Sequence, residues 1–243
     1  MNNGKSGTAI ITGASSGIGA ATARSLVAQG YDVVLTARRE DRLDMLATEL
    51  GSSAMALAVD VSDRDGMSRV VAETLRHFGG VDVLINNAGT MPVASFAEAD
   101  MDDWDRMIDI NLKGVLYGIK AVLPHMLRQG GGDIVSIASI AGLRATAING
   151  VYAATKSAVR FAMESLRQET GRSAIRSTII TPGAVDTELE ASVTNSNVRQ
   201  ALETTIDFKL LDPSAIADAI LYALAQPRNV CIGEIVIRPT AQA

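Results

Sequence analysis

The chain has 243 residues, the length of one α/β domain, and is large enough to bury a substantial core. It is 47% hydrophobic but only 4% aromatic, so its core must be mostly aliphatic, and its net charge of -5 argues against nucleic acid or an anionic membrane as a main partner. The single cysteine, Cys231, excludes an internal disulfide and a cysteine-based metal cluster, and two isolated histidines do not make a metal site. The N-terminal residues lack the apolar core of a signal peptide and no apolar run approaches membrane-spanning length, which predicts a cytoplasmic, metal-free protein.

Strand-like and helix-like segments alternate along the chain without a linker. The strand-like runs are rich in Val, Ile and Ala with little polar alternation, which indicates a parallel sheet covered on both faces. The expected strands span residues 8–12, 32–37, 54–60, 81–86, 133–139, 176–181 and 231–238. The expected helices span residues 17–28, 40–50, 65–78, 102–128, 151–170 and 213–225. We therefore predict one α/β domain over residues 1–243, with a mobile lid in the irregular polar stretch 184–210.

A glycine-rich turn joins the first expected strand to the first expected helix. It reads Thr12-Gly13-Ala14-Ser15-Ser16-Gly17-Ile18-Gly19. Residues without a Cβ permit a tight turn and the close approach of a pyrophosphate, and the helix N-terminus presents free N–H groups to that anion. An ordinary strand–helix turn is the alternative, but the position in the first strand–helix unit favours a dinucleotide site.

The end of the second expected strand bears on which dinucleotide is bound. In NAD-binding folds an acidic residue about 20 positions beyond the glycine motif binds the ribose 2′-OH. Counting from Gly17, this position is Ala37, and Arg38 and Arg39 follow it. Two guanidinium groups can bind a 2′-phosphate, so we predict NADP(H) and consider NAD the less favoured cofactor. The alternative is that both arginines are plain solvated charges.

Four further segments end at the edge of the sheet where ligands bind in open α/β folds. The carboxylate of Asp60, in Asp60-Val61, can accept a hydrogen bond from an adenine amino group, and the small residues of Asn86-Asn87-Ala88-Gly89 let a nucleoside lie against the backbone. Ser139 and Pro182-Gly183 end the fifth and sixth strands. Each segment alone is ordinary turn chemistry, but together, beside a glycine motif, they indicate a single site.

Tyr152 and Lys156 stand four residues apart on the helix expected over residues 151–170, so their side chains are neighbours. A phenol has a pKa near ~10 in water, and an adjacent ammonium can lower that pKa and make Tyr152 a general acid–base. The pair occurs by chance on many solvated helices. Its place downstream of a dinucleotide motif is what favours the functional interpretation.

In order and spacing these motifs resemble the classical short-chain dehydrogenase/reductase family over essentially the full length of the chain. The resemblance implies a three-layer, doubly wound Rossmann fold with a seven-stranded parallel sheet, a nicotinamide cofactor and an NADP-preferring pattern at Ala37-Arg38. It implies a catalytic tetrad of Asn111, Ser139, Tyr152 and Lys156. The expected cofactor-binding residues are Gly13, Ser15, Ser16, Gly17, Ile18, Gly19, Arg38, Arg39, Asp60, Val61, Asn87, Ala88, Gly89, Tyr152, Lys156, Pro182, Gly183, Val185 and Thr187.

The tetrad would act together when a carbonyl oxygen gains negative charge. Tyr152 would supply the proton, and Ser139 would hold the oxygen. Lys156 would lower the pKa of Tyr152 and hold the nicotinamide ribose hydroxyls. Asn111 is unfavourable inside the helix expected over residues 102–128, which predicts a local kink able to hold a water that relays protons to Lys156.

The expected substrate pocket is mainly apolar, which favours a small or aliphatic carbonyl or alcohol. Its expected walls are Met91, Val93, Ala141, Leu143, Val185, Leu189 and Phe208. The C-terminal segment 233–240 looks like the branch of the family with 3-hydroxy acid dehydrogenases and clavulanate-type aldehyde reductases. Two alternatives stay open: a redox-sensing regulator that binds NADP without turnover, and an epimerase or dehydratase with tightly bound NAD. We expect a homodimer or homotetramer, since relatives pair through their two long helices.

Overall fold

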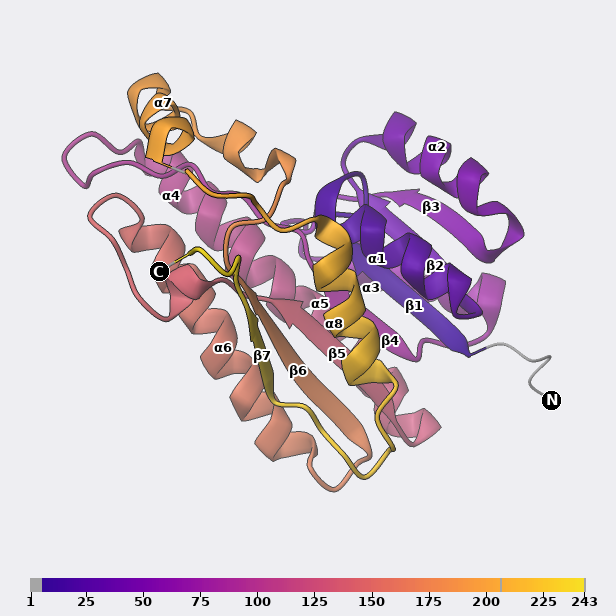
Figure 1. Ribbon diagram of the computed structural model, residues 1–243. Helices are drawn as coiled ribbons and strands as arrows, with labels where there is room; N and C mark the ends of the chain where they lie inside the picture. The colour runs from indigo at the N-terminus through magenta and orange to yellow at the C-terminus, as the bar shows by residue number, and fades with distance from the viewer. Residues whose placement is uncertain (1–5, 206, 243) are drawn as a thin grey trace.

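One seven-stranded parallel sheet runs through the computed structural model, which describes residues 6–205 and 207–242 (Figure 1). The strand order is β3-β2-β1-β4-β5-β6-β7, and every neighbouring pair is parallel. The strands are β1 (Gly7–Thr12), β2 (Tyr31–Ala37), β3 (Ala54–Ala58), β4 (Val83–Asn86), β5 (Gly132–Ile137), β6 (Ile175–Pro182) and β7 (Glu234–Ile237). The predicted doubly wound Rossmann-type α/β fold is confirmed.

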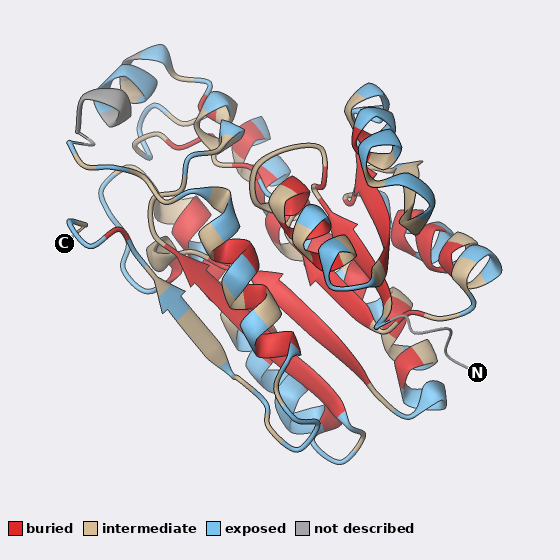
Figure 2. Ribbon diagram, turned by 45° about the vertical axis from the view of Figure 1, so that its right-hand side comes forward, coloured by how far each residue is buried: buried red, intermediate tan, exposed pale blue. Residues whose placement is uncertain are grey.

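Helices cover both faces of this sheet, so its five inner strands are buried, whereas the edge strands β3 and β7 are partly exposed (Figure 2). The helices are α1 (Gly17–Ala28), α2 (Glu40–Leu50), α3 (Gly66–Phe78), α4 (Met101–Ile108), α5 (Gly114–Gln129), α6 (Gly150–Thr170), α7 (Ser196–Thr205) and α8 (Pro213–Leu224). Helices α1, α2 and α8 lie on one face, and α3, α5 and α6 on the other (Figure 1). None of the helices in the described ranges is long and apolar enough to cross a membrane.

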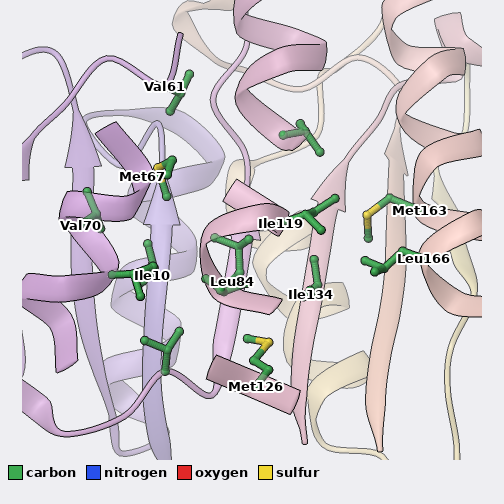
Figure 3. Close-up of a cluster of buried hydrophobic side chains, with 14 of the residues drawn as sticks. Ile10, Val61, Met67, Val70, Leu84, Ile119, Met126, Ile134, Met163 and Leu166 are labelled. Carbon is green, nitrogen blue, oxygen red and sulfur yellow. The ribbon is translucent and has the colours of Figure 1, made fainter. Parts of the chain in front are cut away.

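The core consists of two apolar clusters, one on each face of the sheet. Neighbouring residues of β1 belong to different clusters, Ile10 to one and Ile11 to the other, because successive side chains of a strand point to opposite faces. Figure 3 shows the first cluster, in which Leu84 and Ile134 of the central strands pack between Met67 of α3 and helices α5 and α6. These aliphatic layers hold the carboxyl ends of the strands in fixed relative positions, and this positions the site.

The order of the strands also determines where a ligand can lie. The chain passes from β1 outward to β2 and β3, then returns to β4 on the other side of β1 and continues to β7. At the carboxyl ends of β1 and β4 the connections therefore diverge to opposite sides. Open α/β sheets bind their ligands in the crevice at such a switch point.

Several expected elements differ from those observed. The helix expected over residues 102–128 is divided into α4 and α5 by a π-helical turn, η2 (Asp109–Lys113). Strand β3 ends at Ala58 rather than at residue 60, and β7 begins at Glu234 rather than at residue 231. The polar stretch 184–210 contains a 3-10 turn, η4 (Glu188–Ser192), and helix α7, neither of which its composition predicted.

Candidate functional site

The glycine turn between β1 and α1 has backbone geometry that side chains would prevent. Gly13 and Gly17 have φ angles of 67° and 52°, in the left-handed region. A Cβ on Gly13 would lie 2.8 Å from the Cα of Ala88, and a Cβ on Gly19 would overlap the carbonyl oxygen of Gly13. Glycine is therefore required at these positions by the close packing of the turn against the segment that follows β4.

Hydrogen bonds fix the segment after β4 to this turn. The side-chain amide of Asn87 donates to the carbonyl oxygens of Thr12 (2.9 Å) and Gly13 (3.2 Å). The Thr12 hydroxyl accepts from the backbone N–H groups of Asn87 (2.9 Å) and Ala88 (3.1 Å). The side chain of Asn87 thus shapes the turn, and the small residues Ala88 and Gly89 form the adjacent floor of the crevice.

The start of α1 has the features of an anion site. Its N-cap residue, Ser16, makes no side-chain capping hydrogen bond in the described structure, and its first turn holds no acidic residue. The N–H groups at the start of the helix therefore retain their capacity to bind an anion. A Cβ on Gly17 would lie 3.0 Å from the Cγ2 of Thr187, so the segment after β6 closes over the turn. This cradle fits the pyrophosphate of a dinucleotide in both shape and charge. Ile18 is half-buried and packs on the core beneath it.

The two arginines after β2 occupy different environments. Arg38 is exposed, with no hydrogen bond or ion pair to the rest of the described chain. Arg39 donates from Nη2 to the hydroxyls of Ser15 and Ser16, both at 2.9 Å, and from Nη1 to Glu188 (2.7 Å). Arg39 and the serines of the glycine turn therefore meet at the end of the crevice beside β2, where the adenosine of a bound dinucleotide would lie.

Two predicted contacts are restricted by the packing around them. Asp60 lies in the turn beyond β3, where its Oδ1 accepts from the backbone N–H (2.9 Å) and the hydroxyl (2.7 Å) of Ser62. Val61 is buried in the core and would touch a Cβ on Gly114. Only the backbone of Val61 can face a cofactor, because its side chain belongs to the core.

Gln242, near the C-terminus, contacts the segment after β6 and holds it in place. The side-chain oxygen of Gln242 accepts from the N–H of Ala184 (3.0 Å) and lies where a Cβ on Gly183 would be. Pro182 ends β6, and Val185 forms a bridge with Leu211 and packs on the core. Sequence reasoning missed Gln242, because no local pattern connects a tail residue to a strand end.

Tyr152, Ser139 and Lys156 come together at the carboxyl end of β5. Tyr152 and Lys156 lie on α6, and the Lys156 Nζ is 5.9 Å from the centre of the Tyr152 ring. Ser139 follows β5, and its hydroxyl hydrogen-bonds the phenol of Tyr152 and accepts from the N–H of Ala141 (3.1 Å). The loop between β5 and α6 therefore brings Ser139 next to Tyr152.

The pKa of Tyr152 differs from the expectation. Burial raises the pKa of Tyr152 to about 12, and the hydrogen bond from Ser139 opposes this only in part. Burial also lowers the pKa of Lys156 to about 8, and its Nζ donates to the carbonyl oxygen of Ile137 (2.9 Å). The pKa of the phenol is therefore raised overall rather than lowered, contrary to the expectation, because desolvation is the largest influence on it.

Asn111 lies within the π-helical turn, which confirms the predicted kink. Its side-chain Oδ1 accepts from the N–H of Thr90 (2.8 Å), and its Nδ2 donates to the carbonyl oxygen of Thr90 (2.9 Å) and the hydroxyl of Thr155 (3.2 Å). The side chain therefore joins the loop after β4 to α6, and the proton-relaying water stays a prediction. A Cβ on Gly89 would lie 3.4 Å from the Asn111 Oδ1 and 3.6 Å from the Lys156 Nζ, so the crevice floor adjoins the tetrad.

A narrow hollow beside Tyr152 is more aromatic than expected. Its walls include Val93, Phe96 and Trp104, and the two aromatic rings meet edge to face with centres 5.8 Å apart. Of the predicted walls, Val93 lines this hollow, whereas Ala141 and Leu143 line a neighbouring groove along α6. Met91 packs on the cluster around Tyr152, while Val185 packs on the core; Leu189 and Phe208 line neither space. Composition could not place Phe96 and Trp104, because they come from a loop and a helix that only the fold brings together.

No group of three or more His, Cys, Asp and Glu side chains arranged to hold a metal ion occurs within residues 6–205 and 207–242.

A parallel sheet of this strand order, with a glycine cradle at its switch point, defines a dinucleotide-binding α/β protein. The sequence profile of the family described as "short chain dehydrogenase" matches residues 7–197, and the chain belongs to this family of oxidoreductases.

Individual relatives agree with that assignment. An uncharacterized oxidoreductase of Staphylococcus saprophyticus is 42% identical over 246 residues, with 100% of both chains covered. A structure described as the closed form of serine dehydrogenase complexed with NADP+ is similar with a TM-score of 0.92 and 33% identity, covering 97% of this chain and 96% of that chain. A short-chain dehydrogenase/reductase from Burkholderia phymatum in complex with NAD is similar with a TM-score of 0.88 and 26% identity, covering 97% and 90%.

Proposed function

We propose that the protein is an NADP(H)-dependent oxidoreductase that transfers a hydride between the nicotinamide and a small or aliphatic carbonyl or alcohol, with Tyr152 as general acid–base. The observation that carries this proposal is the meeting of the Tyr152 phenol, the Ser139 hydroxyl and the Lys156 ammonium beside the glycine cradle. When bound, the nicotinamide supplies or accepts the hydride. The residues of the chain have to bind and orient the substrate oxygen and to move its proton.

The protonation states in this structure suit the reductive direction. With a pKa of about 12, Tyr152 carries its proton at neutral pH and can donate it to an oxygen that is gaining negative charge. The Ser139 hydroxyl stabilises that oxygen through a second hydrogen bond. With a pKa of about 8, Lys156 is mostly charged at neutral pH and stabilises the phenolate that remains.

The cofactor assignment rests on charges near the end of β2. Ala37 provides no carboxylate for a ribose 2′-OH, while Arg38 is unpaired in the described chain and Arg39 contacts both serines of the glycine turn. A 2′-phosphate between these groups would accept charge-assisted hydrogen bonds. One similar structure contains NADP+ and another contains NAD, so the proposal of NADP(H) depends on these residues rather than on the relatives.

The substrate proposal rests on the hollow beside Tyr152. Its walls include the apolar and aromatic side chains of Val93, Phe96 and Trp104, which favours a compact, mainly apolar group next to the reacting carbon. The similarity to a serine dehydrogenase supports a small hydroxy acid or the related carbonyl compound, in line with the branch that segment 233–240 resembles. Segment 184–210 would act as the lid over this substrate.

We also propose a homodimer or homotetramer. Leu116 and Leu127 on α5 and Phe161 on α6 are exposed apolar residues on the two long helices, and the Phe161 side chain is 77% exposed. Exposed apolar side chains on both long helices support a surface that a second copy can cover.

The test is to mix the purified protein with NADPH or NADH and a panel of small carbonyl compounds and to follow the nicotinamide absorbance. We expect steady NADPH oxidation, and we expect Tyr152→Phe to lower kcat by about 10²- to 10⁴-fold while NADPH binding is retained. Tyr222→Phe, a change at an exposed tyrosine of α8, is the matched control and should retain wild-type kcat.

The other outcomes are distinct. Tight NADPH binding without turnover on any carbonyl would indicate the redox-sensing regulator. Turnover of a sugar nucleotide without net oxidation would indicate an epimerase. Wild-type turnover by Tyr152→Phe would contradict the acid–base assignment.

A further inference from the structure

A carboxylate from the lid segment lies among the arginines at the adenosine end of the crevice. Glu188, the first residue of η4, accepts from the Nη1 of Arg39 (2.7 Å) through Oε2 and from the Nη1 of Arg42 (2.6 Å) through Oε1. Arg42 lies in the first turn of α2, three residues after Arg39, which is the N-cap of that helix. These two guanidinium groups, Arg42 first, lower the pKa of Glu188 to about 2, so the carboxylate is charged at any working pH.

Arg39 is shared between this carboxylate and the glycine turn. Its Nε and Nη2 donate to Ser15 (3.2 Å and 2.9 Å) and its Nη2 also donates to Ser16 (2.9 Å), while its Nη1 binds Glu188. One guanidinium therefore links the pyrophosphate cradle to η4. Glu188 supplies a negative group at the arginine cluster to which the proposed function assigns the 2′-phosphate.

The Glu188 contacts are of a kind that a phosphate can displace. The side chains of Arg39, Arg42 and Glu188 are 42%, 37% and 47% exposed, and ion pairs this exposed are weak and screened by salt. A phosphate monoester carries a charge of about -1.5 to -2 and three strong acceptor oxygens. It therefore binds a guanidinium more strongly than a single carboxylate does.

The far end of η4 is held by different contacts. The Ser192 hydroxyl accepts from the N–H of Met91 (2.8 Å) and donates to the carbonyl oxygen of Leu189 (2.6 Å). The Thr194 hydroxyl donates to Asp103 (2.6 Å), and Val193 between them is buried in the cluster that contains Tyr152. Release of Glu188 would thus remove the ion pairs that hold the start of η4 to Arg39 and Arg42, while the Thr187 cap (3.3 Å to the N–H of Leu189) and the attachment beside the hollow stay in place.

We propose that Glu188 is a cofactor-specificity residue: its carboxylate competes with the 2′-phosphate of NADP(H) for Arg39, so that NADP(H), but not NAD(H), releases the start of η4. This inference rests on the proposed function and adds a regulatory connection between the adenosine end of the crevice and the lid segment. In this arrangement Glu188 limits the affinity for NADP(H) and holds η4 in place whenever no phosphate reaches Arg39.

The first test compares Glu188→Gln with the wild type in titrations with NADPH and NADH by calorimetry. We expect the variant to bind NADPH about two- to fivefold more tightly, the size expected when one exposed charged competitor is removed, and to bind NADH with unchanged affinity. Glu190→Gln is the matched control, because Glu190 lies in the same turn and its side chain makes no hydrogen bond or ion pair with the described residues. It should retain both wild-type affinities.

The second test is hydrogen exchange of the backbone amides in residues 189–192. In the wild type we expect faster exchange with saturating NADPH than with saturating NADH. In Glu188→Gln the two cofactors should give the same rates, because the start of η4 is already free of Arg39.

Three results would overturn the inference: weaker NADPH binding by Glu188→Gln, an equal change for both dinucleotides, or wild-type exchange rates that do not depend on the cofactor. Failure of the wild type to bind either dinucleotide would instead refute the proposed function. The two failures are therefore distinguishable.

Discussion

Buried cationic side chains have different surroundings at the amino ends and at the carboxyl ends of the strands. At the amino end, Arg176 is only 4% exposed and donates to Asp133 (2.5 Å), to the carbonyl oxygen of Gln226 (2.7 Å) and to that of Leu224 (2.9 Å). At the carboxyl end, Lys156 is 5% exposed, and its hydrogen bond in the described structure is a single one to the carbonyl oxygen of Ile137.

This difference indicates that the amino-end pair serves stability and the carboxyl-end pair serves the reaction. The Arg176 guanidinium neutralises Asp133 and binds carbonyl oxygens at and after the end of α8, where a helix favours positive charge. Lys156 and Tyr152 are buried without an opposite charge, and both of their pKa values are shifted toward the neutral form. Buried groups with shifted pKa values are typical of functional sites, whereas buried groups with every donor satisfied are typical of structural ones.

The largest effect should come from breaking the amino-end network. Arg176→Ala leaves Asp133 buried with only the partly exposed Arg228 as its partner, so we expect a loss of about 3–5 kcal/mol in the free energy of unfolding. Urea titration followed by circular dichroism measures it. Arg228 is 51% exposed, and Arg228→Ala should cost less than about 1 kcal/mol.

The turnover of Arg176→Ala should be unchanged, in contrast to its stability. The fraction of Arg176→Ala that remains folded should keep the wild-type kcat, because Arg176 lies at the far end of the sheet from Tyr152. A large drop in kcat at unchanged stability would show that the two ends are not separate in function.

The next effect is a loss of cofactor affinity at the carboxyl ends of the strands. In Gly19→Ala the new Cβ would overlap the carbonyl oxygen of Gly13 and lie 2.7 Å from the Nδ2 of Asn87, so the cradle must shift. We expect NADPH affinity to fall at least about tenfold, or ~1.4 kcal/mol, as measured by calorimetry.

Gly130→Ala is the control: its φ of 85° imposes backbone strain, but a Cβ there meets nothing within 4 Å. It should lose about 1 kcal/mol of stability and keep its NADPH affinity. Equal affinities for both variants would refute the role of close packing at Gly19.

The fold was readable from the sequence because each strand and helix has its own local pattern. Apolar runs rich in Val and Ile gave all seven strands, and the errors lie at their ends, as at β3 and β7. There, pairing with a neighbouring strand rather than local composition decides where the strand stops. The irregularity at Asn111 was also readable, because an Asn inside a helix has a known cost.

The site was readable only where its residues belong to sequence motifs. Glu188 was missed because its partners Arg39 and Arg42 lie 149 and 146 residues away, and no short pattern spans such distances. The pKa of Tyr152 was predicted in the wrong direction for a related reason. Burial depends on how the whole chain packs, whereas the spacing of Tyr152 and Lys156 reports only that they are neighbours.

The last effect should sharpen the comparison through pH. The pKa of Lys156 is about 8 in the folded protein, because burial disfavours the ammonium, and 10.5 is its ordinary value. Between these values the unfolded chain binds a proton that the folded protein has released, so stability rises with pH. Tyr152, with its pKa raised to about 12, reverses the slope only above its ordinary value of 10.0. From pH 8 to pH 10 we therefore expect Lys156 to add about 2 kcal/mol to the free energy of unfolding.

Urea titrations across this range should show the rise in the wild type and in Lys120→Met, a change at an exposed lysine of α5, but not in Lys156→Met. The same slope in all three proteins would mean that burial does not lower the pKa of Lys156. The ammonium of Lys156 would then be as well stabilised in the folded protein as the guanidinium of Arg176.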